Sequence, residues 1–344
     1  MSKRIKVILY GLGHLGRSIA KLVLEKKEGL EIVGAVDCAC NLVGKDVGEA
    51  SGVGRKIGIT LTKDPDGLFS KVKADIVIHT TGSYLRDIYP QIAGCIKAGL
   101  NVVSSCEELS YPYYKYPQLS VQIDKLAKKH GVTVLGTGIN PGFIMDILPI
   151  VLTGVCQDVR SLKVTRMMYS GDRRTSYQKK IGTGMAPEEF KRMIKEGKIT
   201  GHVGLVESIA MIADALRWKL DDIKELPVEA VVSDMEEKTW TDPTKQTPYI
   251  KVKPGQVAGL KSVAHGIKGG KKVVVLEFIS HVNVKEPFDS VSIEGVPNVH
   301  AKIDEGVHGD VGTVAMIVNS IPKVINAVPG LLTMKDLPVP SAAV

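Results

Sequence analysis

The chain of 344 residues is 44% hydrophobic and 24% charged, the balance of a soluble globular protein long enough for two domains. Its net charge of +8 comes from scattered Lys and Arg residues without a basic-aromatic motif, and no apolar stretch is long enough to cross a membrane, so we expect neither a nucleic-acid nor a membrane partner. Its five cysteines include no CxxC pair and no metal-ligand spacing, so we expect reduced thiols, a cytoplasmic location and no metal.

The N-terminal part, residues 1–140, alternates between strand-like and helix-like patterns. Strands are expected at 5–10, 31–37, 75–79, 101–105 and 132–135, and helices at 15–27, 65–72, 87–98 and 117–130. Alternation at this spacing predicts βαβ units, and therefore an α/β fold with a Rossmann-type parallel sheet. Ligands of such sheets bind beyond the carboxyl ends of the strands, so chemistry is expected in the loops that follow the strands.

A glycine-rich turn, Gly11-Leu12-Gly13-His14-Leu15-Gly16, lies between the first expected strand and the first expected helix. In a dinucleotide fingerprint the first glycine permits a tight turn, the second lets the backbone approach the pyrophosphate, and the third lets helix and strand pack closely. Asp37 ends the second expected strand, where a carboxylate accepts hydrogen bonds from ribose hydroxyls. No arginine follows Asp37 directly, and Lys45 is the nearest cation, so we expect these residues to bind NAD. NADP is the alternative, because some enzymes with a carboxylate at this position still accept it.

Two further loops carry candidate residues. In the small polar turn that follows the third strand, Thr80, Thr81 and Gly82 are expected to approach the ribose and nicotinamide, and Ser104 ends the next strand. Glu107 and Glu108 come after it, and these adjacent carboxylates are the best acid–base candidates in the chain. Neighbours at a strand end point to opposite sides, so only one is expected to face the substrate. Alternatively, both are surface glutamates or glutamates at a helix N-terminus.

The segment GTGINPGF, residues 136–143, predicts a tight connection at the end of the fifth strand. Its Asn140 either hydrogen-bonds a carboxamide of the ligand, as expected for the cofactor, or holds the turn itself. Phe143 and, shortly after it, Met145 are either pocket walls or ordinary core residues.

After Asn140 the pattern changes to an alternation of apolar and polar residues, typical of half-buried strands. Such runs occupy 159–169, 227–233, 257–264, 271–284 and 289–294, with helical patterns at 187–196, 203–217 and 310–327. We expect a second, α+β domain over 141–309 with a mostly antiparallel sheet, and a last helix that packs on the first domain, so that 310–344 completes it. The basic residues of the second domain are each more commonly solvated or core residues than catalysts: Arg166, Arg173, Arg174, His202 and His265.

With these residues in view, the chain resembles the amine dehydrogenases of the 2,4-diaminopentanoate dehydrogenase family, whose first domain is related to dihydrodipicolinate reductase. The matching segments are spread over nearly the whole chain: GLGHLG at 11–16, LVGKDVGE at 42–49, SSCEELSYP at 104–112, GTGINPGFIMDILP at 136–149, GHVGLVESIAMI at 201–212 and HGDVGT at 308–313. The EHHH segment of dihydrodipicolinate reductases is absent, and Glu107-Glu108 stands where homoserine dehydrogenases place a lysine.

The resemblance implies NAD(P)-dependent oxidative deamination of an amine to a ketone, or in reverse reductive amination with ammonia. It implies that Glu107 or Glu108 contacts the amine and handles protons, and that the substrate is 2,4-diaminopentanoate or a similar small amine. Arg166 would meet a carboxylate, and the domain 141–309 would bind substrate and form a homodimer through its sheet. The implied pocket is lined by Asn140, Phe143, Met145, Arg166 and His265.

Two other functions remain open at this point. One is a different NAD(P)-dependent oxidoreductase on the same scaffold, of the dihydrodipicolinate reductase or homoserine dehydrogenase type, because a fold does not determine its substrate. The other is a non-catalytic dinucleotide-sensing protein. An assay for ammonia-dependent oxidation of NADH separates all three.

Overall fold

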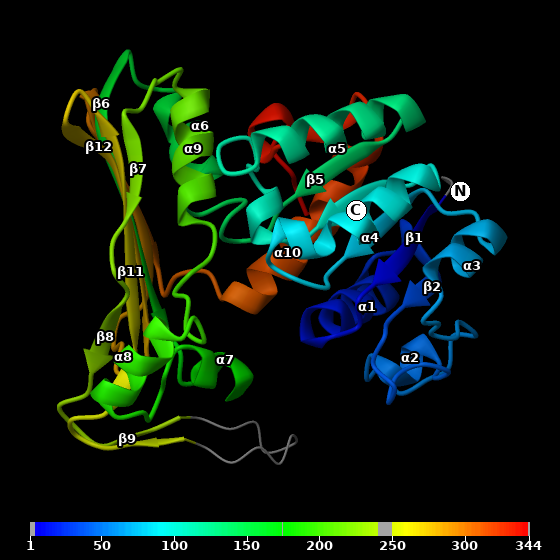
Figure 1. Ribbon diagram of the computed structural model, residues 1–344, viewed down its shortest axis with the longest axis horizontal. Coiled ribbons are helices and arrows are strands. Elements are labelled where there is room, and N and C mark those ends of the chain that lie inside the picture. Colours follow the sequence, from blue (N-terminus) through cyan, green and yellow to red (C-terminus); the bar gives the residue numbers. More distant parts are fainter. Residues whose placement is uncertain (1–3, 174, 240–249, 343–344) are drawn as a thin grey trace. The chain divides into compact units, whose positions relative to one another are not determined.

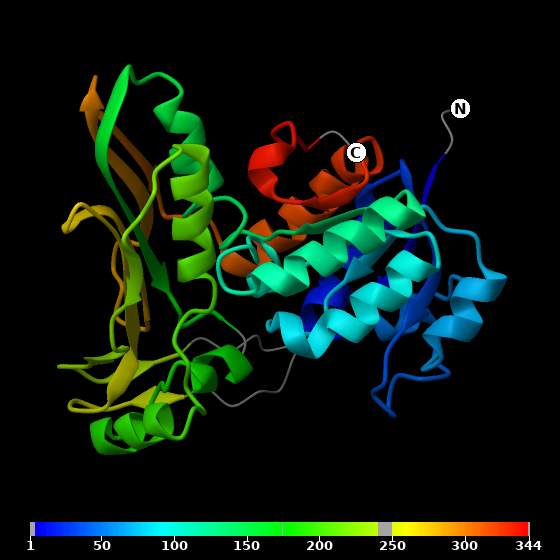
Figure 2. The ribbon, with the colours of Figure 1, turned by 45° about the horizontal axis from the view of Figure 1, so that its top comes forward.

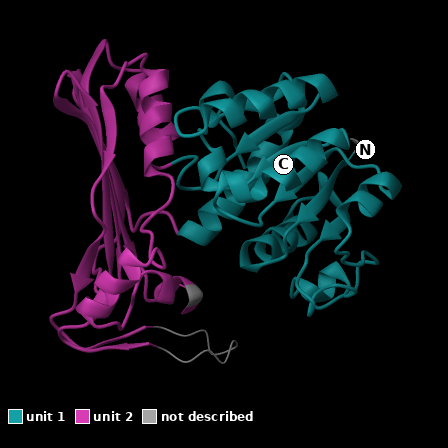
Figure 3. Cartoon of the chain, viewed as in Figure 1, with its two compact units in different colours: residues 1–143, 309–344 teal, residues 144–308 magenta. Residues whose placement is uncertain are grey.

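A computed structural model describes residues 4–173, 175–239 and 250–342. The chain forms two compact units (Figure 3): unit 1 comprises Met1–Phe143 with Gly309–Val344, and unit 2 comprises Ile144–His308. The boundaries expected from the sequence, after residues 140 and 309, lie close to these two crossings. Among the described residues, no helix is both long and apolar enough to span a membrane.

Unit 1 is built on a six-stranded sheet in which every neighbouring pair is parallel. Its strands, in spatial order, are β15 (Gly330–Leu332), β5 (Thr133–Gly136), β4 (Asn101–Ser104), β3 (Ile76–His79), β1 (Ile5–Tyr10) and β2 (Leu30–Val36). Side chains of both faces are buried, as in Val7 and Ile8 of β1, so helices must cover both. The Rossmann-type parallel sheet predicted from the alternating pattern is confirmed.

Two helix pairs cover this sheet (Figure 1). They are α1 (His14–Lys26) with α10 (Gly309–Ile325), and α4 (Leu85–Lys97) with α5 (Pro117–His130). Ile88 and Ile92 of α4 share one apolar core with Ile8 of β1 and Val102 of β4. The last long helix, α10, belongs to unit 1 together with the N-terminal residues.

Four short elements among the described residues of unit 1 were not expected from the sequence. They are α2 (Val47–Ala50), the 3-10 turns η1 (Glu107–Leu109) and η3 (Met334–Asp336), and the edge strand β15. A further helix, α3 (Pro65–Lys71), matches its prediction. Each unexpected element spans only three or four residues, too few for a periodic pattern to be recognised. Pro329-Gly330, expected only to close the last helix, leads directly into β15.

Unit 2 contains a seven-stranded sheet that is antiparallel except for one pair. In spatial order the strands are β14 (Val299–Asp304), β13 (Phe288–Val296), β6 (Asp158–Tyr169), β12 (Lys271–His281), β11 (Val257–Lys268) and β7 (Asp222–Glu225), with β8 (Glu229–Val232) also paired to β11. The exception is the parallel pair β6–β12. The mostly antiparallel sheet expected for the second domain is therefore confirmed.

Helices of unit 2 pack against one face of this sheet (Figures 1 and 2). α6 (Ile147–Thr153) contacts β6 and β13, and α9 (Leu205–Ala215) contacts β11 and β12. Gly266 of β11 makes room for α9, because a Cβ there would lie 2.9 Å from a methyl carbon of Ile209. The remaining elements of the unit are α7 (Thr175–Lys180), α8 (Pro187–Lys195) and a small ribbon of β9 (Glu237–Lys238) and β10 (Lys251–Val252).

Candidate functional site

The glycine-rich turn between β1 and α1 has the geometry of a phosphate cradle. A Cβ at Gly16 would lie 2.0 Å from the carbonyl oxygen of Gly11, and Gly11 itself has φ +100°, so both positions require glycine. At Gly13, by contrast, no described atom lies within 4 Å of the place a Cβ would take. No side chain caps the start of α1 at Gly13, so its first amide groups and dipole suit a bound phosphate.

Asp37 follows β2 and holds two of the loops together. One carboxylate oxygen accepts a hydrogen bond from the backbone N–H of Leu12, and the other accepts one from Ala39 at 2.8 Å. The carboxylate thus lies against the fingerprint turn, at the carboxyl edge of the sheet. The open side of Gly13, the uncapped α1 and Asp37 together fit a dinucleotide cofactor.

The turn after β3 belongs to the same edge of the sheet. The Thr80 hydroxyl donates to the carbonyl of Gly11 at 2.9 Å, so this residue fastens the fingerprint turn. Thr81 is exposed and Gly82 is half-buried, with a Cβ at Gly82 placed 3.2 Å from Ile88. Ser104, also expected to bind the cofactor, is fully buried, and its hydroxyl contacts the ring of His79 at 2.9 Å.

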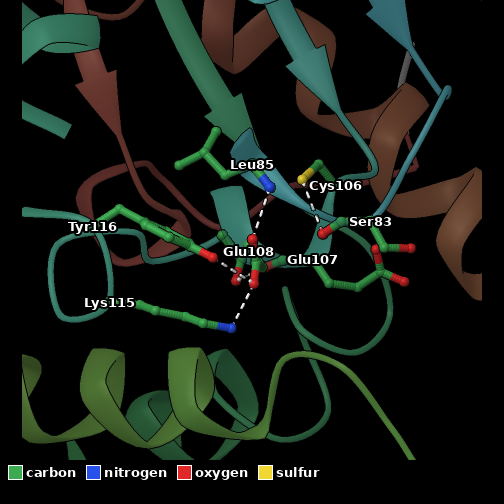
Figure 4. Close-up of polar contacts among 8 residues, drawn as sticks. Ser83, Leu85, Cys106, Glu107, Glu108, Lys115 and Tyr116 are labelled. Atoms are coloured by element: carbon green, nitrogen blue, oxygen red, sulfur yellow. Dashed lines mark hydrogen bonds and ion pairs between the residues drawn. The ribbon is translucent and has the colours of Figure 1, made fainter. Parts of the chain in front are cut away.

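Glu108 lies on η1 with its carboxylate directed into unit 1 (Figure 4). Its side chain is 1% exposed and accepts hydrogen bonds from the Leu85 backbone N–H at 2.8 Å, the Tyr116 hydroxyl at 3.0 Å and the Lys115 ammonium. The Leu85 contact places a negative charge at the N-terminus of α4, where the helix dipole favours it. Glu108 is therefore held by partners of its own unit.

Glu107 occupies the same turn but projects differently. Its side chain extends to the side of the turn opposite Lys115 and Tyr116 (Figure 4), and the residue is half-buried. The expectation that the two glutamates point to different sides agrees with this geometry, although they lie on a 3-10 turn and not at a strand end. The thiol of Cys106 donates to the Ser83 carbonyl at 3.2 Å, and burial raises its pKa, which keeps it a donor.

The GTGINPGF segment packs directly under η1. A Cβ at Gly136 would lie 2.4 Å from the carbonyl carbon of Leu109, and one at Gly142, where φ is +128°, would lie 2.4 Å from the backbone nitrogen of Gly138. The backbone N–H of Ile139 donates to Thr313 of α10 at 3.3 Å. The motifs at 104–112, 136–143 and 308–313, far apart in the sequence, thus meet at one edge of the sheet of unit 1.

The other residues expected near this segment are distributed over both units. Asn140 is half-buried in unit 1, and Phe143 is the last residue of that unit before the chain enters unit 2. Met145 is fully buried within unit 2. Next to it is Asp146, a residue that sequence reasoning missed: its carboxylate caps α6 at Ile147 and accepts the Ser208 hydroxyl at 2.8 Å.

Arg166 is 1% exposed and forms part of a buried cluster in unit 2. Its guanidinium lies 3.4 Å from the carboxylate of Asp289 and donates to the carbonyl of Val307, whose N–H donates to the same carboxylate. Burial lowers the pKa of Arg166 and raises that of Asp289, while their mutual attraction opposes both shifts. Asp289 was not singled out in the sequence, because only the pairing of β6 with β13 brings it to Arg166.

The register of the sheet separates Arg166 from His265. His265 pairs with Val275, and Val275 pairs with Lys163, so the three side chains share one face. Arg166 is three positions from Lys163 on β6 and therefore points to the opposite face. Burial and the nearby Lys272 lower the pKa of His265.

Two of the remaining basic residues named in the sequence analysis, His202 and Arg173, pack against aromatic rings. The His202 ring stacks on Phe278 with centroids 4.2 Å apart, and Phe278 pairs with Arg166, so both lie on the face of Arg166. The guanidinium of Arg173 is buried and lies 4.5 Å from the centre of the Tyr177 ring. Arg174 lies outside the described residues.

A parallel sheet with a glycine cradle at its first turn, a carboxylate after its second strand and a carboxylate-bearing turn after its fourth defines a Rossmann-type, dinucleotide-dependent oxidoreductase scaffold. Family comparison agrees: residues 5–106 match the N-terminal domain of dihydrodipicolinate reductase, and residues 143–344 match the C-terminal domain of 2,4-diaminopentanoate dehydrogenase. The chain belongs to the 2,4-diaminopentanoate dehydrogenase family.

Similar proteins extend over nearly the whole chain. The 2,4-diaminopentanoate dehydrogenase of Acetoanaerobium sticklandii is 38% identical over 346 residues, covering 99% of this chain and 95% of that protein. An amine dehydrogenase of Streptomyces virginiae is 24% identical and covers 97% and 96%. The structure of an amine dehydrogenase from Mycobacterium smegmatis superimposes with a TM-score of 0.84 at 24% identity, covering 99% and 98%, which shows a shared fold.

Proposed function

We propose that this protein catalyses the NAD(P)-dependent oxidative deamination of a small amine, and in reverse the reductive amination of a ketone with ammonia. The observation that supports this most directly is the glutamate-bearing turn η1 at the carboxyl edge of a dinucleotide-binding sheet, in a chain 38% identical to a 2,4-diaminopentanoate dehydrogenase. The substrate class is a 2,4-diaminopentanoate-type amine. One protonated amine, one water and one NAD(P)⁺ give one ketone, one ammonium, one NAD(P)H and one proton.

We assign different roles to the two glutamates. Glu108 positions the turn, because its carboxylate already binds Leu85, Lys115 and Tyr116 within unit 1. Glu107, on the other side of the turn, takes the proton from the substrate ammonium and later activates the water that hydrolyses the iminium. General-base help of this kind contributes about 10²–10⁴-fold to the rate. When bound, the nicotinamide supplies the hydride chemistry.

We propose NAD as the preferred cofactor. Asp37 presents a carboxylate beside Leu12, where it favours ribose hydroxyls and repels the 2′-phosphate of NADP. No arginine follows Asp37 directly, and Lys45 is the nearest cation. The binding residues are the fingerprint turn, Asp37 and the turn around Thr80. Replacing Asp37 with Ser is expected to narrow the difference in KM between NAD and NADP.

Arg166 remains the candidate for the carboxylate of the substrate. A guanidinium has five N–H donors, and the hydrogen bonds of Arg166 to the described residues Met168, Asp289 and Val307 use three. Asn140, Phe143 and Met145 remain candidate pocket residues. His265 receives no role in this proposal, because it lies on the opposite face of the sheet from Arg166.

We also propose a homodimer formed through the face of the unit 2 sheet that α6 and α9 leave uncovered. Half-buried apolar residues on this face, such as Val275 and Ile279, surround Glu277, which bridges Lys163 and Lys261. Light scattering after gel filtration tests this: Ile279→Asp should give a monomer, and an unchanged dimer would contradict the assignment.

All five cysteines are free, which fits the expected cytoplasmic location.

The decisive assay follows NADH oxidation with 2-amino-4-oxopentanoate in the presence and absence of ammonia. The proposal predicts turnover that requires ammonia. Oxidation without ammonia would instead indicate reduction of a carbonyl by a related oxidoreductase. NADH binding with no turnover on any ketone would indicate a sensing protein.

A further inference from the structure

A buried polar chain connects the ends of β3 and β4 and has no part in the mechanism above. His79, the last residue of β3, is 0% exposed, and its ring contacts the Ser104 hydroxyl through Nδ1 at 2.9 Å. On its other side, Nε2 lies 2.8 Å from the side-chain oxygen of Gln91 on α4 and 2.9 Å from the Thr81 hydroxyl. The Tyr10 ring meets the histidine edge-on, with centroids 5.5 Å apart.

The direction of these hydrogen bonds follows from their partners. The Gln91 oxygen is an acceptor, so the histidine carries its proton on Nε2 and donates it there. The Nδ1 atom is then an acceptor, and the Ser104 hydroxyl donates a hydrogen bond to it. The oxygen of that hydroxyl in turn accepts the backbone N–H of Cys106 at 3.1 Å. The chain therefore runs without a break from Cys106 through Ser104 and His79 to Gln91.

This arrangement requires a neutral ring. Burial lowers the pKa of His79 to about 4, so the imidazole is uncharged at neutral pH and Nδ1 keeps its lone pair. A protonated ring would present two N–H donors and could not accept a hydrogen bond from the Ser104 hydroxyl.

The chain ties together the two loops that carry the proposed chemistry. The residue after Cys106 is Glu107, and the residues after His79 form the turn of Thr80 and Thr81. Backbone bonds reinforce the link, since Ser105 N–H donates to the His79 carbonyl at 3.0 Å and Glu108 N–H to the Ser83 carbonyl at 3.3 Å. The side-chain link through Ser104 fixes the position of the Cys106 amide, and hence the position of η1, which begins at the next residue.

We propose that His79 is a positioning residue for the amine reaction: by accepting the Ser104 hydroxyl it fixes Cys106 and so holds Glu107 at the reactive position relative to the Thr80–Ser83 turn. This inference rests on the proposed function. It changes the role of Ser104 from cofactor contact to connector. A displacement of a catalytic group by about 1 Å costs on the order of 10²-fold in rate, whereas binding of the cofactor by the glycine turn is largely spared.

Two substitutions of similar size test the hydrogen bonds of Nδ1 and Nε2 separately. The amide of an asparagine reaches the place of Nδ1, so His79→Asn keeps an acceptor for Ser104 and loses Gln91. The amide of a glutamine reaches the place of Nε2, so His79→Gln keeps Gln91 and loses Ser104. Ser104→Ala removes the connector itself and supplies a third variant if a histidine variant does not fold.

The test measures kcat for ammonia-dependent NADH oxidation and, separately, the Kd for NADH. We expect about a 10–100-fold loss of kcat in His79→Gln and in Ser104→Ala, less than about a 3-fold loss in His79→Asn, and a Kd within about 3-fold in all three. The double variant His79→Gln/Ser104→Ala should lose no more than either single one.

Equal losses in the Asn and Gln variants, or losses confined to the Kd, would overturn the inference. So would full activity in Ser104→Ala. If the unaltered protein shows no ammonia-dependent turnover, the proposed function fails and the inference fails with it. If the unaltered protein turns over and His79→Gln matches it, only the inference fails.

Discussion

Two loops at the same edge of the unit 1 sheet are built by different means. The fingerprint turn is made by backbone: Gly11, Gly13 and Gly16 define it through φ angles and the lack of a Cβ. The turn η1 is made by side chains from distant segments, since Glu108 is held by Leu85, Lys115 and Tyr116. We propose that the first loop binds the cofactor and that the second takes part in the reaction, so substitutions should separate the Kd for the cofactor from kcat.

The largest effect is expected at the reacting loop. Glu107→Gln removes the proposed base and should lower kcat by about 10²–10⁴-fold while NADH still binds. Steady-state kinetics and a fluorescence titration of NADH measure the two effects. Glu25→Gln, an exposed carboxylate on α1, is the control and should leave both unchanged. Retained turnover in Glu107→Gln would remove this residue from the mechanism.

The fingerprint turn offers a matched pair of alanine variants. Gly16→Ala places a Cβ 2.0 Å from the Gly11 carbonyl oxygen, and we expect a loss of about 2–4 kcal/mol in unfolding free energy. Gly13→Ala meets no described atom within 4 Å, so stability should stay within about 0.5 kcal/mol while the Kd for NADH rises. Urea denaturation and NADH titration compare them. Equal destabilisation by both would contradict this division between packing and binding.

A substitution of Glu108 should mainly lower the unfolding free energy of the protein. Glu108→Gln turns an amide NH₂ toward groups that are themselves donors, at a site 1% exposed, and should cost about 1–3 kcal/mol in unfolding free energy. Glu25→Gln removes an exposed ion pair between Glu25 and Lys21, whose charged atoms lie 4.0 Å apart. This change should lower the unfolding free energy by less than about 0.5 kcal/mol. Denaturant titration of both variants measures the difference. A Glu108→Gln protein as stable as the control would show that the buried contacts contribute nothing.

The smallest effect is expected at His265. Because it lies on the face opposite Arg166, His265→Ala should change KM for the ketone by less than about 2-fold. Arg166→Lys, which loses the planar fork, should raise KM for substrates that carry a carboxylate more than for simple amines. A larger KM change in His265→Ala than in Arg166→Lys would restore the pocket expected from the sequence.

The difference between the two loops also explains what the sequence could predict. The parallel sheet and its cradle follow from local patterns: alternating periodicity, glycine spacing and a carboxylate about 20 residues on. The separate roles that we propose for Glu107 and Glu108 rest on the contacts of Glu108 with Leu85 and Lys115, which no local sequence pattern predicts. The same holds for Asp289, which lies beside Arg166 only because β13 pairs with β6. It also holds for Arg166 and His265, because the register of the strands places their side chains on opposite faces of the unit 2 sheet.

The His79 chain was missed for a related reason. A lone histidine at a strand end gives no periodic signal, and its partners Ser104 and Gln91 lie on a neighbouring strand and a helix. One clue was present, because Ser104 and the Thr80–Ser83 turn both follow strands that a parallel sheet places side by side. Ser104 was expected to contact the cofactor, while its hydroxyl is engaged with His79 and Cys106.

In the proposed reaction, the hydride and the nitrogen of ammonia are delivered to the same carbon of the substrate. Turnover of 2-amino-4-oxopentanoate with ¹⁵N-ammonium and 4-deuterated NADH, followed by mass spectrometry of the product, tests it directly. We expect a diamine that carries both deuterium and ¹⁵N at C4, and far less of it with Glu107→Gln. A product with deuterium but no ¹⁵N would contradict the proposed reaction, because it would show that the protein reduces the carbonyl to an alcohol.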